Sequence, residues 1–174
     1  MPELWDLLDK DRIPTGKTIL RGKDMADGDY HMVVHVCIFN TNGEMLIQKR
    51  QPFKEGWSGL WDLSVGGSAV SGDDSQKAAE RETFEELGLN INLYGIRPSL
   101  TINFDTGFDD IYLIEMDLNP DDLSLQYEEV EKTTWASKDK ILDMIEKGLF
   151  IPYHRSLISL LFEMHGKCGA IDEN

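Results

Sequence analysis

Three glutamates at helical spacing, Glu82, Glu85 and Glu86, are the side chains of this sequence best suited to chemistry. A helix turns by about 100° per residue, so side chains three and four positions apart are neighbours on one face. Like charges at this spacing cost roughly 0.2–0.5 kcal/mol per pair in water. A hard divalent cation would reverse that cost, because Mg²⁺ binds oxygen ligands and keeps waters and substrate phosphates in its other positions. The alternative is a solvated acidic helix face, which is common.

The residues on either side of these glutamates predict the elements that position them. A short strand from Leu60 to Val65 is expected to deliver the chain to a loop that carries Gly66 and Gly67. Asp74 or Ser75 is expected to cap the helix at its start, and Gly88 to end it. A narrow face of small residues is expected to pack on a sheet and consists of Ala78, Ala79, Thr83 and Leu87.

The stretch from Gly66 to Leu89 resembles the Nudix box, written Gly-x5-Glu-x7-Arg-Glu-U-x-Glu-Glu-x-Gly-U, where U is a bulky aliphatic residue. The matching residues are Gly67, Arg81, Glu82, Glu85, Glu86, Gly88 and Leu89. Asp73 stands where the motif has Glu, and Thr83 stands where it has U. A fixed spacing of this length is far more specific than a lone glycine motif.

The resemblance implies a fold, a cofactor and a set of roles. The fold would be an α/β/α sandwich with a mixed sheet, and the activity would be Mg²⁺- or Mn²⁺-dependent cleavage of a nucleoside diphosphate linked to another group. Glu82, Glu85 and Glu86 would hold the metal with the backbone carbonyl of Gly66 or Gly67. Arg81 would orient the cluster by pairing with Glu85 and with the carboxylate at position 73. Asp73 is one methylene shorter than Glu, which puts that last pairing in question.

Diphosphate hydrolysis also needs a group that activates or orients water. Glu86 is the first candidate for a metal ligand, whereas Glu85, Asp109 and Asp110 are the candidates for the base. For the two aspartates, a polar strand start is an equal alternative.

Residues 3 to about 90 also resemble the Nudix subgroup related to type I isopentenyl diphosphate isomerase. The shared residues are the run from His31 to Val34, Phe39, Asn40, Gly43, Lys49, Arg50, Lys54, Trp57, Gly59, Trp61, Ser64 and Val65, with Pro14 to Gly16 in an N-terminal hairpin. In that isomerase the residues matching Arg50 and Lys54 bind the diphosphate, and the same role is implied here. The alternative is exposed, solubilising charge. Arg50 is the stronger candidate because Lys lacks the two-pronged guanidinium.

The chain departs from the isomerase where isomerisation needs its acid–base groups. Gly66 stands in place of the catalytic Cys, Ser68 in place of a metal-binding His, and Asp24 near another such His. His31 remains, and a strand histidine is its simpler interpretation. Trp57 and Trp61 could stack on a base or an isoprenoid, but core or loop packing is favoured for both.

Three functions follow, in order of preference. The first is a metal-dependent hydrolase of a nucleoside diphosphate derivative or related organic diphosphate. The second is a Nudix-fold module that binds a nucleotide without turnover, motivated by Asp73 and Thr83. The third is an isomerase, which the missing Cys and His weigh against.

Composition limits the partners. The 174 residues carry a net charge of −15, which argues against nucleic acid polymers and anionic membranes as partners. A small diphosphate substrate is compatible with that charge if a metal or placed cations receive it.

The N-terminus lacks a signal peptide pattern and no apolar run is long enough to span a bilayer, so a cytoplasmic protein is expected. Cys37 and Cys168 are too few for a disulfide framework or zinc site, and Cys37 is expected to be buried. A homodimer is left open.

The pattern of elements predicts one α/β domain over residues 1–174. A hairpin extension is expected over 3–29, the Nudix core over 30–164 and a disordered tail over 165–174. Expected strands are 31–39, 45–48, 91–104, 111–116 and 133–135, with an Asn42–Gly43 turn and an acidic loop over 119–131. Expected helices are 138–147, capped by Ser137, and 153–164. Strands first and helices last suggest a mixed sheet between helices.

Overall fold

The computed structural model describes residues 3–171, and its central element is strand β3 (His31–Phe39). β3 is mostly apolar and largely buried, as expected of a strand that has neighbours on both sides. It runs parallel to β8 (Gly107–Glu115) along its whole length and antiparallel to β6 (Val65–Ser68). The sheet is therefore mixed, as the sequence predicts.

The rest of the main sheet extends from these strands. Its order is β5 (Trp61–Asp62), β4 (Met45–Arg50), β3, β8 and β7 (Leu100–Phe104), while β9 (Val130–Ala136) pairs with β4. β3 and β4 pair only at Phe39 and Met45, next to the Asn42–Gly43 turn. The two strands then diverge, and β6 pairs with β3 on the side from which β4 has moved away.

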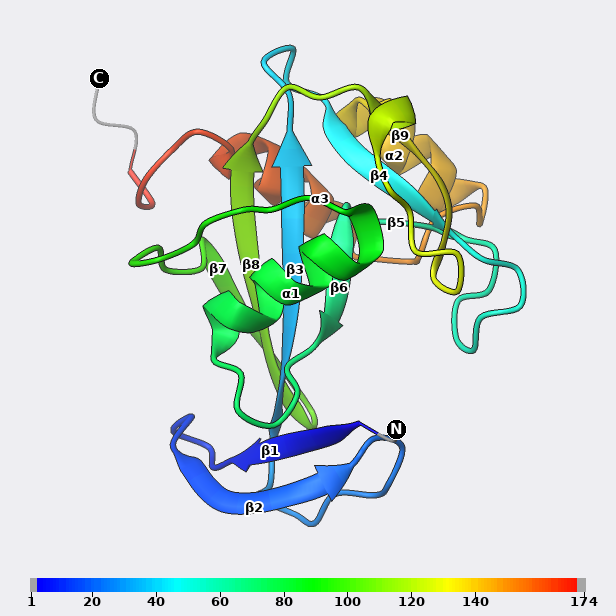
Figure 1. The fold of residues 1–174 in the computed structure, drawn as a ribbon. Helices are drawn as coiled ribbons and strands as arrows, with labels where there is room; N and C mark the ends of the chain where they lie inside the picture. Colours follow the sequence, from blue (N-terminus) through cyan, green and yellow to red (C-terminus); the bar gives the residue numbers. More distant parts are fainter. Residues whose placement is uncertain (1–2, 172–174) are drawn as a thin grey trace.

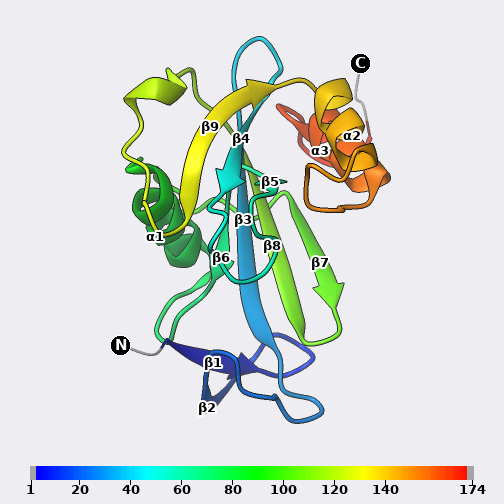
Figure 2. The ribbon, with the colours of Figure 1, turned by 90° about the vertical axis from the view of Figure 1, so that its right-hand side faces the viewer.

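Helices cover both faces of the sheet, which gives an α/β/α sandwich (Figures 1 and 2). Helix α1 (Ser75–Leu87) lies on one face, whereas α2 (Lys138–Glu146) and α3 (Arg155–Met164) lie on the other. Alternate residues of β3 enter the two cores: Val34, Val36 and Ile38 pack under α1, while Cys37 and Phe39 pack under α2 and α3. Burial of Cys37 is thereby confirmed.

The N-terminal hairpin forms a separate two-stranded sheet at one end of the molecule (Figure 1). It consists of β1 (Leu4–Leu8) and β2 (Pro14–Leu20), as the sequence predicts. Leu8 and Tyr30 exchange backbone hydrogen bonds of 2.8 and 2.9 Å, which fixes the hairpin to the start of β3. The Asp6 carboxylate accepts from Ser71 Oγ and Gly72 N at 2.6 and 2.8 Å, which ties the hairpin to the loop before α1.

Several predicted boundaries were wrong. The strand expected over 91–104 is confined to β7, because residues 91–99 form turns around Gly95. The strand expected over 60–65 is two short strands, β5 and β6, which pair with different partners. Gly66 and Gly67 lie in β6 and not in a loop.

The acidic segment contains a short 3-10 helix, η1 (Pro120–Asp122), and α3 begins at Arg155 and not at 153. In the tail, residues 165–171 form turns and bends, while 172–174 lie outside the described residues. Within residues 3–171, no helix is both long and apolar enough to cross a membrane.

Candidate active site

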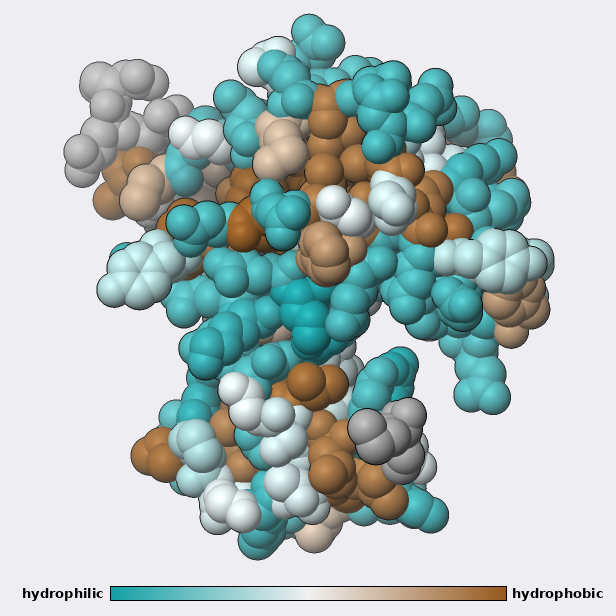
Figure 3. All heavy atoms as spheres, in the orientation of Figure 1, coloured by the Kyte–Doolittle hydropathy of each residue, from teal (hydrophilic) through white to brown (hydrophobic). Residues whose placement is uncertain are grey.

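Helix α1 places the glutamates, and both of its ends are fixed. Asp74 is the N-cap, and its side chain accepts a hydrogen bond from Lys77 N. Gly88 ends the helix in the left-handed region, with φ of 70°, and donates its N–H to Phe84 O. Gln126 N donates to Glu86 O at 3.0 Å, so the loop after η1 also satisfies the last turn. The hydrophilic band across the middle of Figure 3 overlies this helix.

Glu86 is a buried carboxylate, and Glu82, one helical turn before it, is partly buried with its side chain 15% exposed. Glu86 is only 3% exposed and accepts a 2.8 Å hydrogen bond from Gln48 Nε2. Burial, and then repulsion from Glu82, raise the pKa of Glu86 to about 8. Burial also raises the pKa of Glu82, and this outweighs the stabilising effect of Arg81. A carboxylate buried beside a second one at this spacing is unfavourable unless a cation contacts it.

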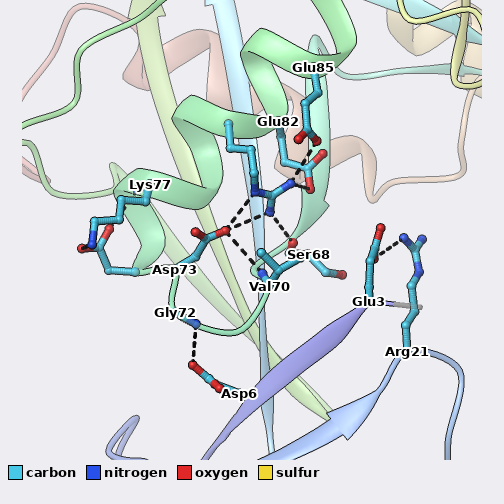
Figure 4. A network of polar contacts seen from close by, with 12 residues as sticks. Glu3, Asp6, Arg21, Ser68, Val70, Gly72, Asp73, Lys77, Glu82 and Glu85 are labelled. Carbon is cyan, nitrogen blue, oxygen red and sulfur yellow. Dashed lines mark hydrogen bonds and ion pairs between the residues drawn. The ribbon is translucent and has the colours of Figure 1, made fainter. Parts of the chain in front are cut away.

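Arg81 connects the helix to the loop before it. Its Nε donates to Asp73 Oδ2 at 3.0 Å, and its Nη1 donates to Glu82 Oε1 and Glu85 Oε2 at 3.0 and 3.1 Å. Nη2 donates to the carbonyl of Ser68 at 3.0 Å. Figure 4 shows Asp73, Glu82 and Glu85 directed at one guanidinium. The predicted pairing of Arg81 with Glu85 and position 73 is confirmed, and the shorter Asp73 side chain reaches its partner.

The second departure from the motif, Thr83, lies away from the carboxylates. Its side chain is fully buried on the core face of α1, and its hydroxyl donates to Ala79 O at 2.7 Å. A polar residue is accommodated at this apolar position because its only hydrogen is used within the helix.

Gly66 and Gly67 leave room for two functional side chains on opposite faces of β6. A Cβ on Gly67 would lie 2.1 Å from Glu82 Cδ, and a Cβ on Gly66 would lie 2.7 Å from His35 Cδ2. Distances under 3.0 Å are not tolerated by real side chains. Because successive residues of a strand face opposite sides, β6 separates the glutamates of α1 from His35.

The donors near Gly67 suit a hard divalent cation. Across residues 3–171, no three His, Cys, Asp or Glu side chains lie close enough to form a complete metal site on their own. Mg²⁺ does not need one, because it is usually held by one or two carboxylates together with waters and substrate phosphates. Glu86 supplies a buried carboxylate and Glu82 a partly buried one, and the Glu82 carboxylate fills the space beside Gly67.

Residues 29–158 match the NUDIX domain family, and this span is most of the chain. The chain belongs to the Nudix hydrolase family. A Nudix hydrolase of Listeria monocytogenes is 50% identical over 151 residues, which cover 87% of this chain and 89% of the relative. The isopentenyl-diphosphate isomerase of Corynebacterium diphtheriae is a weaker relative, 23% identical over 160 residues, with 85% and 86% of the two chains covered.

Solved structures support the fold. A crystal structure of a Deinococcus radiodurans protein superposes with a TM-score of 0.73 at 22% identity and covers 92% of this chain and 98% of its own. A Francisella tularensis NMN adenylyltransferase/ADP ribose pyrophosphatase, solved with AMP and a Mn ion, gives 0.58 at 19% identity over 77% of this chain and 41% of its own.

In this Nudix protein Arg50 and Lys54 each contact an acidic side chain, Asp62 and Glu129 respectively. Arg50 makes long contacts, from Nη1 to Asp62 Oδ2 at 3.4 Å and from Nη2 to Gly56 O at 3.3 Å, and its buried Nε has no partner. Lys54 pairs with Glu129, and burial followed by the charge of Arg50 lowers its pKa. Neither residue is the exposed solubilising charge of the alternative interpretation, because the side chains are 14% and 16% exposed.

Asp109 and Asp110 are the other candidates for the base, and both contact residues other than the glutamates of α1. Asp110 is fully buried and holds Arg12 of the hairpin through two hydrogen bonds of 3.0 and 2.6 Å, so it has a structural partner. Asp109 pairs with Nδ1 of His35 at 2.7 Å on the face of the sheet away from α1. His31 stacks on Trp5 at 4.3 Å and contacts Thr106 O, which agrees with a strand histidine.

The two tryptophans of interest differ in their surroundings. Trp57 is 54% exposed on the loop after β4, whereas Trp61 is partly buried against the core under α2 and α3. Packing is therefore confirmed for Trp61.

Sequence reasoning missed four polar side chains of the site, namely His35, Gln48, Asp62 and Tyr153. The only signal for His35 was a polar residue interrupting an apolar strand. Gln48 and Asp62 lie in strands whose pairing the sequence does not specify, and Tyr153 precedes a helix on the opposite face.

Proposed function

We propose that the chain hydrolyses the diphosphate linkage of a nucleoside diphosphate derivative or a related organic diphosphate, with Mg²⁺ or Mn²⁺ as cofactor. The observation that carries the proposal is that Glu86 is buried one helical turn from the partly buried Glu82, whose carboxylate lies where a side chain at Gly67 would be. A purely structural helix face has no reason to bury a carboxylate beside a second one that repels it. The Mn ion in the Francisella neighbour's crystal is consistent with this cofactor.

The residues of the site have four roles: metal ligand, positioning residue, base and diphosphate-binding residue. Glu82, Glu85 and Glu86, with the backbone carbonyl of Gly67, are the metal ligands. Arg81 is the positioning residue, since its guanidinium already joins Glu82 and Glu85 to the loop. A bound divalent cation would neutralise charge on the phosphate oxygens and make a water nucleophilic.

Glu85 is the candidate for the base that accepts a proton from the attacking water, because it is the exposed member of the cluster, with 46% of its side chain accessible. In the reaction a new P–O bond forms to that water and the bridging P–O bond breaks. Glu86 contributes its charge to the same cluster from a buried position.

Arg50 and Lys54 are the proposed diphosphate-binding residues. Both are cations on the β4 side of the site, and the Nε–H of Arg50 has no protein acceptor. A phosphate oxygen would accept a hydrogen bond from this Nε–H, and its negative charge would offset the positive charges of Arg50 and Lys54.

The two alternative functions are less well supported. Asp73 and Thr83 motivate the nucleotide-binding module, but Asp73 Oδ2 accepts from Arg81 Nε at 3.0 Å and the Thr83 hydroxyl is hydrogen-bonded within α1. For an isomerase, the two thiols are poorly placed: Cys37 is in the core with a pKa raised by burial, and Cys168 lies beyond α3.

We propose a cytoplasmic protein with a single Nudix domain over 1–174, divided at residues 29/30 and 164/165. Its partner is a small diphosphate and not a nucleic acid polymer or membrane, and a homodimer is one possible assembly.

The test is product release from a panel of nucleoside di- and triphosphates, nucleotide sugars, dinucleotides and isoprenoid diphosphates. Each would be incubated with Mg²⁺, with Mn²⁺ and with chelator. We expect at least one member to be hydrolysed only when metal is present. Calorimetric binding of a member without any product would instead favour the binding module, and movement of the double bond of isopentenyl diphosphate would favour the isomerase.

A further inference from the structure

A cavity of about 500 Å³ lies on the α3 side of β6. Gly66 and Gly67 form part of its wall, and Ile151, Tyr153 and Leu157 close it from the side of α3. Its volume is within the range of small-molecule sites, roughly 300–1,000 Å³. Strand β6 lies between the glutamates and this cavity. Within the described residues it pairs only with β3, so its other edge has no strand partner.

The cavity has a connected polar floor. Tyr153 OH donates to Asp62 Oδ1 at 2.8 Å and lies 3.3 Å from His35 Nε2. The other nitrogen of His35 contacts Asp109 Oδ1 at 2.7 Å. The Tyr153 hydroxyl thus links the Asp62 carboxylate to the His35 imidazole, which in turn contacts Asp109.

Arg50 joins this floor to the diphosphate-binding side. It lines the cavity, and its Nη1 contacts Asp62 Oδ2 at 3.4 Å. Its Nε is buried and has no partner, which is unusual for a guanidinium and costs free energy unless a ligand supplies an acceptor.

Trp57 stands at the edge of the same cavity in a strained conformation. Its φ is 52°, a region that bulky residues rarely adopt, and the ring is half exposed. Such conformations cluster at ligand-binding positions, where surrounding structure maintains them.

We propose that this cavity is the subsite for the group attached to the diphosphate, and that it selects a hydroxyl-bearing group such as a sugar over a hydrocarbon such as an isoprenoid. Tyr153, His35 and Asp62 are the specificity-determining residues. The inference rests on the proposed hydrolysis only for where the diphosphate lies.

The selection follows from the cost of covering polar groups. A hydrocarbon in the cavity would remove the remaining water from Asp62 and His35 and return no hydrogen bond. Sugar hydroxyls both donate and accept, so they can replace that water at the carboxylate, imidazole and phenol. Sites built to hydrogen-bond a ligand therefore reject analogues that lack its polar groups.

The experiment compares two ligands that share a diphosphate and differ in the attached group. Methylene-bridged analogues of ADP-ribose and of the geranyl ester of ADP resist hydrolysis, so their Kd values can be measured by calorimetry with Mg²⁺. Wild type would be compared with Tyr153→Phe, which removes only the hydroxyl. Tyr94→Phe is the matched control, because Tyr94 is 92% exposed on a turn outside the cavity.

We expect wild type to bind the sugar analogue at least about tenfold more tightly than the geranyl analogue. Tyr153→Phe should weaken binding of the sugar analogue by about tenfold and change geranyl binding less than about twofold, whereas Tyr94→Phe should change neither. Tighter binding of the geranyl analogue by wild type would overturn the proposal, and that result does not depend on whether Tyr153→Phe folds.

Hydrolysis of unmodified ADP-ribose and of the geranyl ester of ADP is followed separately. Preferential sugar binding without metal-dependent product would contradict the proposed hydrolysis and leave the cavity assignment standing. Metal-dependent hydrolysis with a preference for the geranyl group would support the proposed hydrolysis and contradict the cavity assignment.

Discussion

Burial distinguishes the three glutamates of α1 from one another. Glu86 is buried, Glu82 is partly buried, and Glu85 is the most exposed of the three, with both Glu82 and Glu85 in contact with Arg81. The spacing in the sequence predicted that all three share one face of the helix. It could not predict how exposed each side chain is, because exposure depends on how β6 and β4 pack against the helix. Gln48, which contacts Glu86 from β4, belongs to that missing information.

Gly67→Ala should abolish most of the activity while leaving the fold intact. The new Cβ would meet the Glu82 carboxylate at about 2 Å and displace it, so we expect kcat to fall by at least about 100-fold. Gly95→Ala is the control, because its φ of 74° imposes backbone strain in open space far from the glutamates. Equal activity losses in the two variants would remove Gly67 from the site.

At the scale of elements, the hairpin supports the loop that positions Arg81. Asp6 in β1 binds Ser71 and Gly72, and that loop continues to Asp73, which holds Arg81 (Figure 4). The sequence predicted the hairpin itself from turn residues and apolar weight. It could not predict where the hairpin docks, since the contacts join residues more than 60 positions apart.

Asp6→Ala should therefore lower activity although Asp6 lies outside the carboxylate cluster. Loss of its two hydrogen bonds should cost roughly 1–2 kcal/mol of stability and lower kcat by about three- to tenfold. Urea unfolding and steady-state kinetics would measure these effects. Asp11→Ala is the comparison, because the Asp11 side chain is exposed in the turn of the same hairpin and pairs there with Lys10, and comparable kinetic effects in both variants would argue against this coupling.

The pairing of Arg12 with Asp110 should make the protein less stable in acid. Burial alone would raise the pKa of Asp110, but hydrogen bonds from Arg12 and its neighbours lower it below the ordinary value. A carboxyl with a lowered folded-state pKa stabilises the fold above its unfolded pKa of about 3.9, and this contribution is lost as pH falls through the folded value. Asp110→Asn should lose this part of the acid dependence in unfolding measurements between about pH 6 and 2; an unchanged profile would contradict the assignment.

Element boundaries were predictable where a side chain signals them. Asp74, Gly88, Ser137 and the Asn42–Gly43 turn all lie where capping and turn chemistry place them. The segment 91–99 was misjudged because its apolar residues suggested a strand, while the turn at Gly95 interrupts it. The segment 60–65 is split into β5 and β6 because β3 and β4 diverge and each pairs with a different part of it. This divergence arises from the tertiary structure and has no local signal in the sequence.

At the scale of the whole molecule, the α/β/α sandwich follows from alternation along β3, which needs cover on both faces. The sequence predicted this architecture from the order of strands and helices. It gave no indication of the cavity on the α3 side, because Tyr153, Asp62 and His35 come from three separate parts of the chain.

The net charge of −15 should make stability depend on salt in a definite direction. Excess like charge destabilises a compact state, and salt screens it over about 10 Å at 0.1 M. We expect the unfolding midpoint to rise by a few degrees as NaCl increases from about 10 to 300 mM. A midpoint that falls over this range would show that favourable ion pairs outweigh the net repulsion.

The central claim is that the buried carboxylates of α1 support metal-dependent hydrolysis. Its most direct test is the Mg²⁺ dependence of kcat for wild type, Glu86→Gln and Glu80→Gln on the best substrate of the panel. Glu80 lies on the same helix, and its Oε1 only accepts from Leu93 N at 2.6 Å, a bond that a Gln oxygen can keep. The account predicts that Glu86→Gln stays folded and loses at least about 100-fold in kcat, while Glu80→Gln keeps wild-type turnover. Undiminished turnover in folded Glu86→Gln would contradict it.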